Sequence, residues 1–149
     1  MIKKTLFILL FALSSCGYQP LYSTKTSKDL IFKKIELTGN KKVNRRVISL
    51  MNIKENSNKF FYEELVLKNS KKIIETSKNS KGQPDSFKMI INISVKIEDK
   101  DGSTKQHQLS KEFGYKNLEN KFNLTEYEDN LQNNLIDEIV EELVLLINL

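Results

Sequence analysis

The segment KMIINISVKIED, residues 88–99, decides the fold class of this chain. Apolar and polar side chains alternate along it, which is the pattern of a β-strand with one buried face and one solvated face. The side chains expected to face the core are Met89, Ile91, Ile93, Val95 and Ile97. Since an apolar sheet face must be covered, the flanking sequence is expected to supply further strands and helices.

Turn signals on both sides of this strand predict antiparallel neighbours. The sequence DKDG at residues 99–102 suits a tight hairpin turn. It leads into a return strand over residues 105–115, which places Leu109, Phe113 and Tyr115 on one face. Upstream, residues 79–82 (NSKG) form another turn. The segment before it, residues 64–77, is consistent with either one long strand or two short ones.

The N-terminal part of the domain predicts a strand followed by a helix. Residues 30–37 (LIFKKIEL) form the strand, and Thr38-Gly39 closes it. Asn40 is suited to cap a helix. One face of that helix is expected to carry Val43, Val47, Leu50 and Met51, and residues 55–59 are expected to be a loop.

A long helix is predicted at the C-terminal end. Thr125 to Glu128 fits a capping box, in which the hydroxyl and the carboxylate bond to free amides. The apolar stripe of the helix contains Leu131, Leu135, Ile139, Leu143 and Ile147. The order β-α-β-β-β-α predicts an α+β fold over residues 30–149. We expect a two-layer α/β sandwich, with two helices packed on a mostly antiparallel sheet.

The first 15 residues have the layout of an export signal. Lys3 and Lys4 precede an apolar run at residues 6–13, LFILLFAL, which is too short to span a bilayer because a span needs about 20 apolar residues. Leu13-Ser14-Ser15-Cys16 follows and has the pattern of a bacterial lipobox. We expect cleavage before Cys16 and attachment of lipid to its sulfur. Residues 16–29 would then form the lipidated N-terminus and a polar tether.

Cys16 is the only cysteine, so it has no disulfide partner within the chain. It either pairs with another molecule or is chemically modified. The alternative to a lipid anchor is an incidental cysteine behind a buried N-terminal helix. The charged start, the apolar run and their spacing favour the anchor, and with it attachment to a membrane.

Charge is divided unevenly along the chain. Residues 25–121 contain 22 basic and 12 acidic residues, whereas residues 122–149 contain seven acidic residues and no Lys or Arg. A basic body favours anionic partners. Because an exported lipoprotein does not meet nucleic acid, an anionic lipid is the expected ligand. The acidic run of the last helix is expected to be a solvated face or to meet cations on a partner.

No constellation of catalytic residues is visible, and we expect a protein that is not an enzyme. His107 is the only histidine and lies within a predicted strand. With Cys16 assigned to lipid, neither a Cys/His pair nor a zinc cluster can form. No glycine-rich phosphate loop is present. The sequence therefore predicts no cofactor and no metal.

The mature N-terminus resembles that of the LPS-assembly lipoprotein family LptE. Members of that family often begin Cys-Gly-aromatic, and this chain reads CGYQPLY at residues 16–22. The order of elements is similar, and Lys81-Gly82-Gln83 matches a basic-Gly-Gln turn of the family. The resemblance covers the whole mature chain but rests more on the pattern of elements than on identity.

The resemblance implies a protein inside the outer-membrane barrel LptD, which it would help to assemble and would plug. It further implies binding of lipopolysaccharide, a periplasmic location and attachment to the outer membrane. Gly17 is compatible with that sorting, since inner-membrane retention in enteric bacteria uses Asp at this position. The alternative is a structural envelope lipoprotein of similar fold with no lipopolysaccharide role.

Three lysines are the expected lipopolysaccharide-binding residues. Lys78 and Lys81 lie in the turn that matches the family, and ammonium groups bind phosphates by charge and hydrogen bonding. Lys121 precedes the last helix and would join them if both segments lie at one end of the sandwich. An equally open interpretation is that these lysines only solubilise the turn.

The Cys16→Ser variant tests the anchor. We expect an unprocessed precursor that incorporates no radiolabelled palmitate, because the acyl-accepting sulfur is gone. Two or more acyl chains attach durably at about 0.8 kcal/mol per buried methylene, whereas a single chain is marginal. Palmitate labelling equal to that of the wild type would contradict the assignment.

Overall fold

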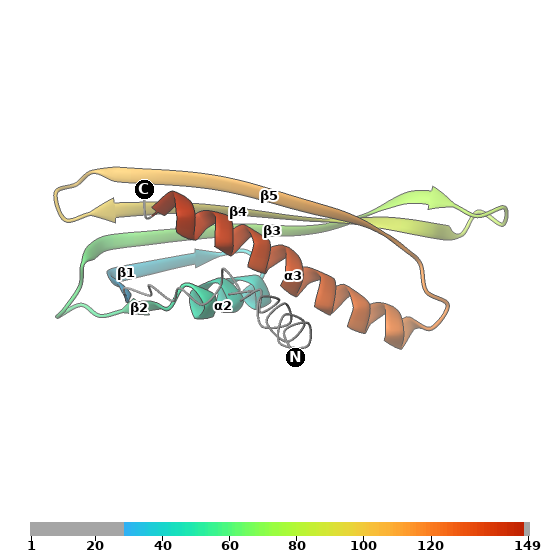
Figure 1. The fold of residues 1–149 in the computed structure, drawn as a ribbon, viewed down its shortest axis with the longest axis horizontal. Helices are drawn as coiled ribbons and strands as arrows, with labels where there is room; N and C mark the ends of the chain where they lie inside the picture. The colour runs from blue at the N-terminus through green and yellow to red at the C-terminus, as the bar shows by residue number, and fades with distance from the viewer. Residues whose placement is uncertain (1–28, 148–149) are drawn as a thin grey trace, which may run out of the picture.

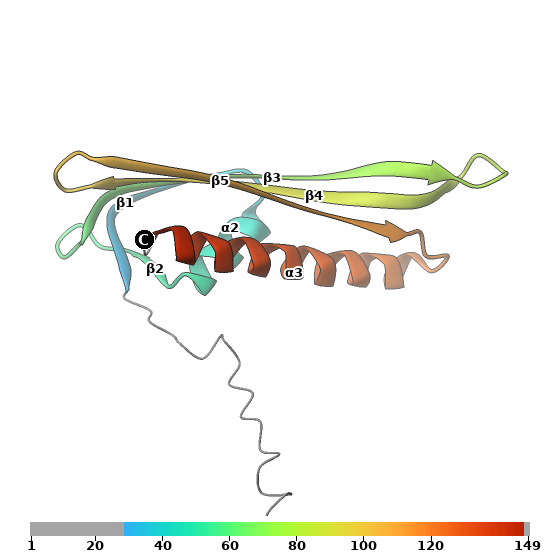
Figure 2. The same ribbon diagram turned by 45° about the horizontal axis from the view of Figure 1, so that its top comes forward.

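A five-stranded sheet carries two helices on one of its faces, in a computed structural model that describes residues 29–147 (Figures 1 and 2). The predicted signal peptide, Cys16 and the tether up to residue 28 lie outside the described residues. The elements are β1 (Leu30–Thr38), α2 (Lys41–Leu50), β2 (Ile53–Glu55), β3 (Tyr62–Lys78), β4 (Pro84–Asp99), β5 (Thr104–Lys116) and α3 (Lys121–Ile147).

The sheet has the strand order β2-β1-β3-β4-β5. β1 runs parallel to both β2 and β3, whereas β3, β4 and β5 form an antiparallel meander. Both helices lie on the same side of the sheet, and the other side is open (Figure 2). The predicted α+β two-layer sandwich with a mostly antiparallel sheet is therefore confirmed. The middle segment is one long strand, β3, and not two.

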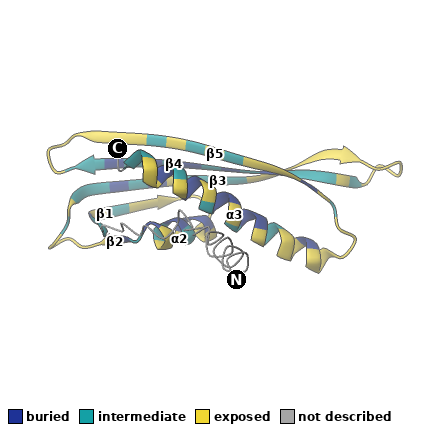
Figure 3. Cartoon of the chain, viewed as in Figure 1, coloured by how far each residue is buried: buried dark blue, intermediate teal, exposed yellow. Residues whose placement is uncertain are grey.

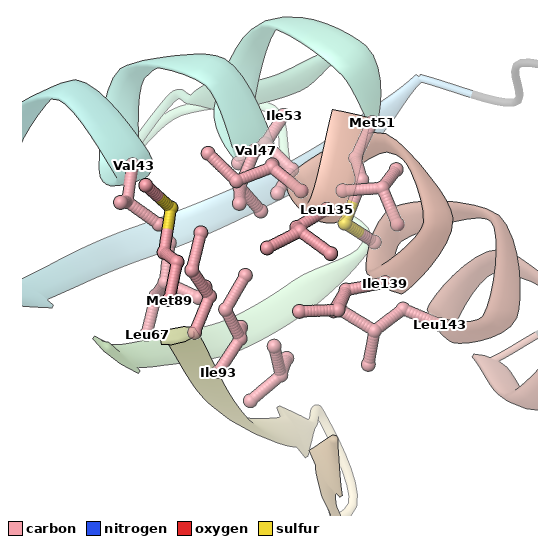
Figure 4. Packing of buried hydrophobic residues seen from close by; sticks show 14 of the residues in the cluster. Val43, Val47, Met51, Ile53, Leu67, Met89, Ile93, Leu135, Ile139 and Leu143 are labelled. Atoms are coloured by element: carbon pink, nitrogen blue, oxygen red, sulfur yellow. The ribbon is translucent and has the colours of Figure 1, made fainter. Parts of the chain in front are cut away.

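The core follows the alternation of β4. Every predicted inward residue of this strand is at most 2% exposed, and the residues between them are half-buried on the open face. Leu135, Ile139 and Leu143 of α3 pack against this row, and Val43 and Val47 of α2 complete the cluster (Figure 4). The strand phase and its helical partner are as the sequence predicts.

The residues of β5 predicted to share one face do so, but they are less buried than the inward residues of β4. Leu109, Phe113 and Tyr115 pair with Ile93, Met89 and Phe87 of β4 and so lie on the helix-facing side. Tyr115 is buried and Leu109 partly buried, but Phe113 is 49% exposed. The reason is that β5 is the edge strand, so Phe113 has a neighbouring strand on one side only.

Asn40 caps α2 as predicted. Its side-chain oxygen accepts hydrogen bonds from the backbone N–H groups of Lys42, at 2.9 Å, and Val43, at 3.3 Å. The inward face of the helix is rotated from the predicted one, because Asn44 is buried and Leu50 is 45% exposed. Leu50 is the last residue of α2, and the following residue, Met51, occupies the core instead.

The short strand β2 is missing from the sequence-based prediction. It has three residues and pairs with β1, so that Leu30 lies opposite Ile53 and Phe32 opposite Glu55. Only Ile53 is apolar, which is too little for periodicity to detect. Its last residue, Glu55, was predicted as loop. This strand forms because β1 has backbone N–H and C=O groups on that edge that are free to hydrogen-bond.

The predicted capping box of α3 is wrong. The helix begins at Lys121, and the side chain of Asn120 accepts hydrogen bonds from the N–H groups of Phe122 and Asn123, at 2.9 and 3.3 Å. The Thr125 hydroxyl instead donates to the Lys121 carbonyl within the first turns. The earlier start is favoured because it lets Leu124 reach the core. Within residues 29–147, no helix is long and apolar enough to cross a membrane.

The reversal from β1 into α2 depends on close contact with β3. Gly39 has φ +105°, and a Cβ atom at this position would overlap the backbone carbonyl oxygen of Asn69. The Asn69 side chain accepts a hydrogen bond from the N–H of Asn40 at 3.0 Å and donates to the Asn44 side chain at 2.6 Å. Its amide is also 3.3 Å from the carbonyl of Thr38. One side chain of the sheet thus holds both ends of this turn.

The Ile93→Asp variant tests the strand phase. An unpaired carboxylate would be buried in apolar surroundings, at a cost of several kcal/mol. That is comparable to the whole stability of a small domain, so we expect an unfolded protein. Ser94→Asp introduces the same group on the open face and should be tolerated. Equal melting temperatures of the two variants in circular dichroism would contradict the phase.

The Gly39→Ala variant tests the contact with β3. We expect a loss of at least about 2 kcal/mol of unfolding free energy, from backbone strain and the overlap with Asn69. Gly102→Ala is the matched control, because Gly102 also has a positive φ, +82°, but has open space around it. A loss no larger than that of the control in urea unfolding would show that the close approach is not needed.

Candidate functional site

The β3–β4 hairpin extends past both helices at one end of the molecule (Figure 1). The far end of β3 is exposed from residue 72 to 78, whereas the facing end of β4 is half-buried apart from Asp85 (Figure 3). We call this end, with the β5–α3 connection beside it, the hairpin-tip site. It contains the predicted residues Lys78, Lys81 and Lys121.

The tip turn is held rigid by its own hydrogen bonds. The backbone N–H of Gly82 donates to the Asn79 carbonyl at 2.9 Å, and the N–H of Asn79 donates to the Gln83 carbonyl at 2.9 Å. The Asn79 side chain accepts from the N–H groups of Lys81 and Gln83, at 2.9 and 3.0 Å. Gly82 has φ +75°, which the turn requires. The lysine side chains therefore extend from a defined backbone.

The β5–α3 connection is fastened to the base of the hairpin by Asn117. Its backbone N–H donates to the Asp85 carbonyl at 2.8 Å, and its side-chain amide donates to the Pro84 carbonyl at 2.8 Å. The two segments enclose a hollow of about 600 Å³. Its lining consists of Asn79, Gln83, Pro84, Asp85, Asn117, Leu118, Glu119 and Lys121.

The structure brings Lys121 to the same end as the turn lysines, as predicted. Lys121 is the first residue of α3 and lines the hollow, whereas Lys78 and Lys81 flank it on the hairpin. All three side chains are exposed. The Lys78 ammonium is 3.9 Å from the Glu75 carboxylate, and Lys81 and Lys121 make no ion pair within residues 29–147.

Carboxylates moderate the charge of the hairpin-tip site. Asp85 and Glu119 line the hollow together with Lys121. The hairpin-tip site is therefore a surface of mixed charge.

A row of three aromatic rings supports the start of α3. The ring centroids of Phe87 and Tyr115 are 5.7 Å apart, and those of Tyr115 and Tyr127 are also 5.7 Å apart. The Tyr115 hydroxyl donates to the Glu128 carboxylate at 2.6 Å. Burial, together with this hydrogen bond to an anion, raises the pKa of Tyr115. The row fixes α3 against β4 and β5 and so sets the position of Lys121.

Two exposed apolar residues belong to the same part of the chain. Leu118 is 37% exposed and lines the hollow, and Phe122, which follows Lys121 in α3, is 76% exposed. Sequence reasoning missed these two residues and Asn117. Asn117 had no signal of its own, because its role depends on the distant Pro84. The exposure of Phe122 could have been predicted only if the start of α3 had been placed at Lys121, because that start puts Phe122 in the first turn of the helix.

His107 lies in β5, and its Nε2 atom is buried without a hydrogen-bond partner among the described residues. No group of three or more His, Cys, Asp or Glu residues between positions 29 and 147 is arranged to hold a metal ion.

Known proteins resemble this chain in structure and not in sequence. No protein-family model matches the sequence, and no curated protein matches it. The crystal structure of rare lipoprotein B from Shewanella oneidensis is similar, with a TM-score of 0.56 at 12% identity, covering 77% of this chain and 93% of that chain. A protein of Caulobacter crescentus assigned as a lipoprotein has a TM-score of 0.51 at 10% identity, covering 74% and 85%. The domain therefore has a fold that also occurs in lipoproteins of these two bacteria.

Proposed function

We propose that this protein is an outer-membrane lipoprotein of the lipopolysaccharide transport machinery. It binds lipopolysaccharide during delivery to the cell surface and assists the assembly of an LptD-like β-barrel, which it plugs. The lipobox at Cys16, the resemblance to the LptE family and the fold shared with bacterial lipoproteins support this proposal together.

The observation that carries the ligand assignment is the composition of the hairpin-tip site. Lys78, Lys81 and Lys121 lie at one end of the molecule, where Leu118 lines the hollow and the exposed Phe122 follows Lys121 in α3. Lipopolysaccharide combines phosphates with acyl chains. Ammonium groups suit the phosphates, and exposed apolar side chains suit the acyl chains. A free inorganic anion would use only the first of these features.

The proposed location is the periplasmic side of the outer membrane. The predicted anchor at Cys16 would tether the domain there, and the resemblance to the LptE family supplies the barrel as partner. Co-purification with a tagged copy of the protein, followed by mass spectrometry, tests this part. A barrel of the LptD type in the eluate is expected, and its absence would contradict the assembly role.

A structural envelope lipoprotein without a lipopolysaccharide role is the second candidate. The carboxylates Asp85 and Glu119 in the hollow, and Glu75 near Lys78, favour it, because they offset part of the positive charge. In that case the lysines only solubilise a projecting hairpin. The ligand-binding experiment below separates the two candidates.

The double variant Lys78→Glu, Lys81→Glu tests the ligand site. We expect lipopolysaccharide to bind at least about tenfold more weakly, since two charge-assisted contacts are replaced by repulsion. Added salt should weaken wild-type binding in the same direction, because exposed charges are screened. Folding and association with the barrel should be unchanged.

The matched control is Lys59→Glu, Lys105→Glu, which makes the same charge change away from the tip. Both lysines are exposed and make no ion pair within residues 29–147. This variant should bind lipopolysaccharide like the wild type in surface plasmon resonance. If the tip variant folds and binds as tightly as the control, the ligand does not bind at the hairpin-tip site.

A further inference from the structure

A second hollow, of about 400 Å³, lies between the two helices. We call it the interhelix cleft. It is lined by residues of α2 and α3 and shares none with the hairpin-tip site. Its volume falls within the range of small-molecule sites, which is about 300–1,000 Å³.

Two ion pairs join α2 to α3 at this cleft. The Lys42 ammonium is 3.2 Å from both carboxylate oxygens of Asp129. Arg46 donates two hydrogen bonds to Asp137, from Nε at 2.7 Å and from Nη2 at 2.6 Å. These cations are neutralised within the protein, so neither pair offers a free charge to a ligand. Their effect is to fix the separation of the helices.

Arg45 is the cation of the cleft that remains free. It lies on the exposed side of α2 between the two paired residues and makes no ion pair within residues 29–147. Its guanidinium group retains all five N–H donors. A planar guanidinium matches the oxygen geometry of a phosphate or carboxylate.

Gln132 adds a side-chain amide to the lining of the same cleft. The residue as a whole is 3% exposed, but its amide atoms are not among the fully buried polar atoms that lack a hydrogen-bond partner in residues 29–147. The amide therefore remains accessible from the cleft. The amides of Gln132 and Asn133 and the hydroxyl of Ser49 thus place neutral donors and acceptors beside the Arg45 guanidinium.

We propose that the interhelix cleft binds a phosphorylated sugar. Arg45 binds the phosphate, and Gln132, Asn133 and Ser49 bind the sugar hydroxyls. Amides and hydroxyls both donate and accept, as sugar hydroxyls require. Inorganic phosphate would leave most of the volume and the neutral groups unused. The inference does not rest on the proposed function, since the cleft is separate from the hairpin-tip site.

The probe is glucosamine 1-phosphate, titrated into the full mature domain while ¹⁵N NMR follows the side-chain amide of Gln132. We expect a saturable shift of that signal. Arg45→Gln should weaken binding about tenfold or more, through loss of a charge-assisted hydrogen bond. Lys41→Gln, on the same helix but outside the lining, makes the same charge change and should bind normally. The wild-type protein should bind glucosamine, which lacks the phosphate, about as weakly as the Arg45→Gln variant binds glucosamine 1-phosphate.

Gln132→Met separates a binding role from a structural one. Methionine has a similar length and no amide, so the melting temperature should be unchanged or higher while the affinity falls. A fall in melting temperature with unchanged affinity would assign Gln132 to folding and overturn the proposal. So would the absence of a saturable shift in the wild type, or equal affinity for inorganic phosphate, which would indicate an adventitious ion only.

Lipopolysaccharide micelles provide a separate arm that identifies the source of the sugar phosphate. If Arg45→Gln weakens binding of both the micelles and the free ester, the cleft receives lipopolysaccharide. If it weakens only the free ester, the ligand is a soluble sugar phosphate. Both results support a binding site in the cleft. Neither depends on the Lys78 and Lys81 variant, which tests the proposed function separately.

Discussion

The amide of Asn69 is the contact on which the arrangement of the two layers depends. It bonds to the chain on both sides of Gly39 and to Asn44 in α2. β1 and β3 are parallel neighbours, so the chain between them must leave the sheet and return. The Asn69 side chain and the missing Cβ of Gly39 make the exit tight enough for α2 to lie directly on the strands. The positions of Val43 and Val47 in the core follow from this.

The difference in length between strands and helices creates the hairpin-tip site. At about 3.3 Å per residue, the 17 residues of β3 span about 55 Å. At about 1.5 Å per residue, α3 spans about 40 Å and α2 about 15 Å. Two helices of this length cannot cover the whole sheet, so the end of the β3–β4 hairpin projects beyond them (Figure 1). The lysines of the turn are exposed for that geometric reason.

The acidic surface of α3 is used mainly within the domain. Asp129 and Asp137 pair with α2, Glu142 pairs with Lys111 of β5, and Glu128 accepts the Tyr115 hydroxyl. The ion pairs among these lie at the surface with their side chains about one third to two thirds exposed, and surface pairs contribute about 0–1 kcal/mol each. They therefore orient α3 more than they stabilise it. The basic body and the acidic helix are complementary layers of one fold, and the cations that make no ion pair within residues 29–147 include Arg45 and the tip lysines Lys81 and Lys121.

Local signals in the sequence were enough to predict the buried face of β4 and the start of α2. The alternation of β4 identified its buried face, and Asn40 identified the start of α2, because period and capping depend on neighbouring residues only. The tertiary structure alone decided the short strand β2, the start of α3 at Lys121 and the exposure of Leu50. It also brought Asn117 into hydrogen-bond contact with Pro84 and Asp85, and it placed Gln132 between the two helices. Each of these depends on a partner distant in the chain, and the free energy of a long-range contact cannot be read from the residues on one side of it.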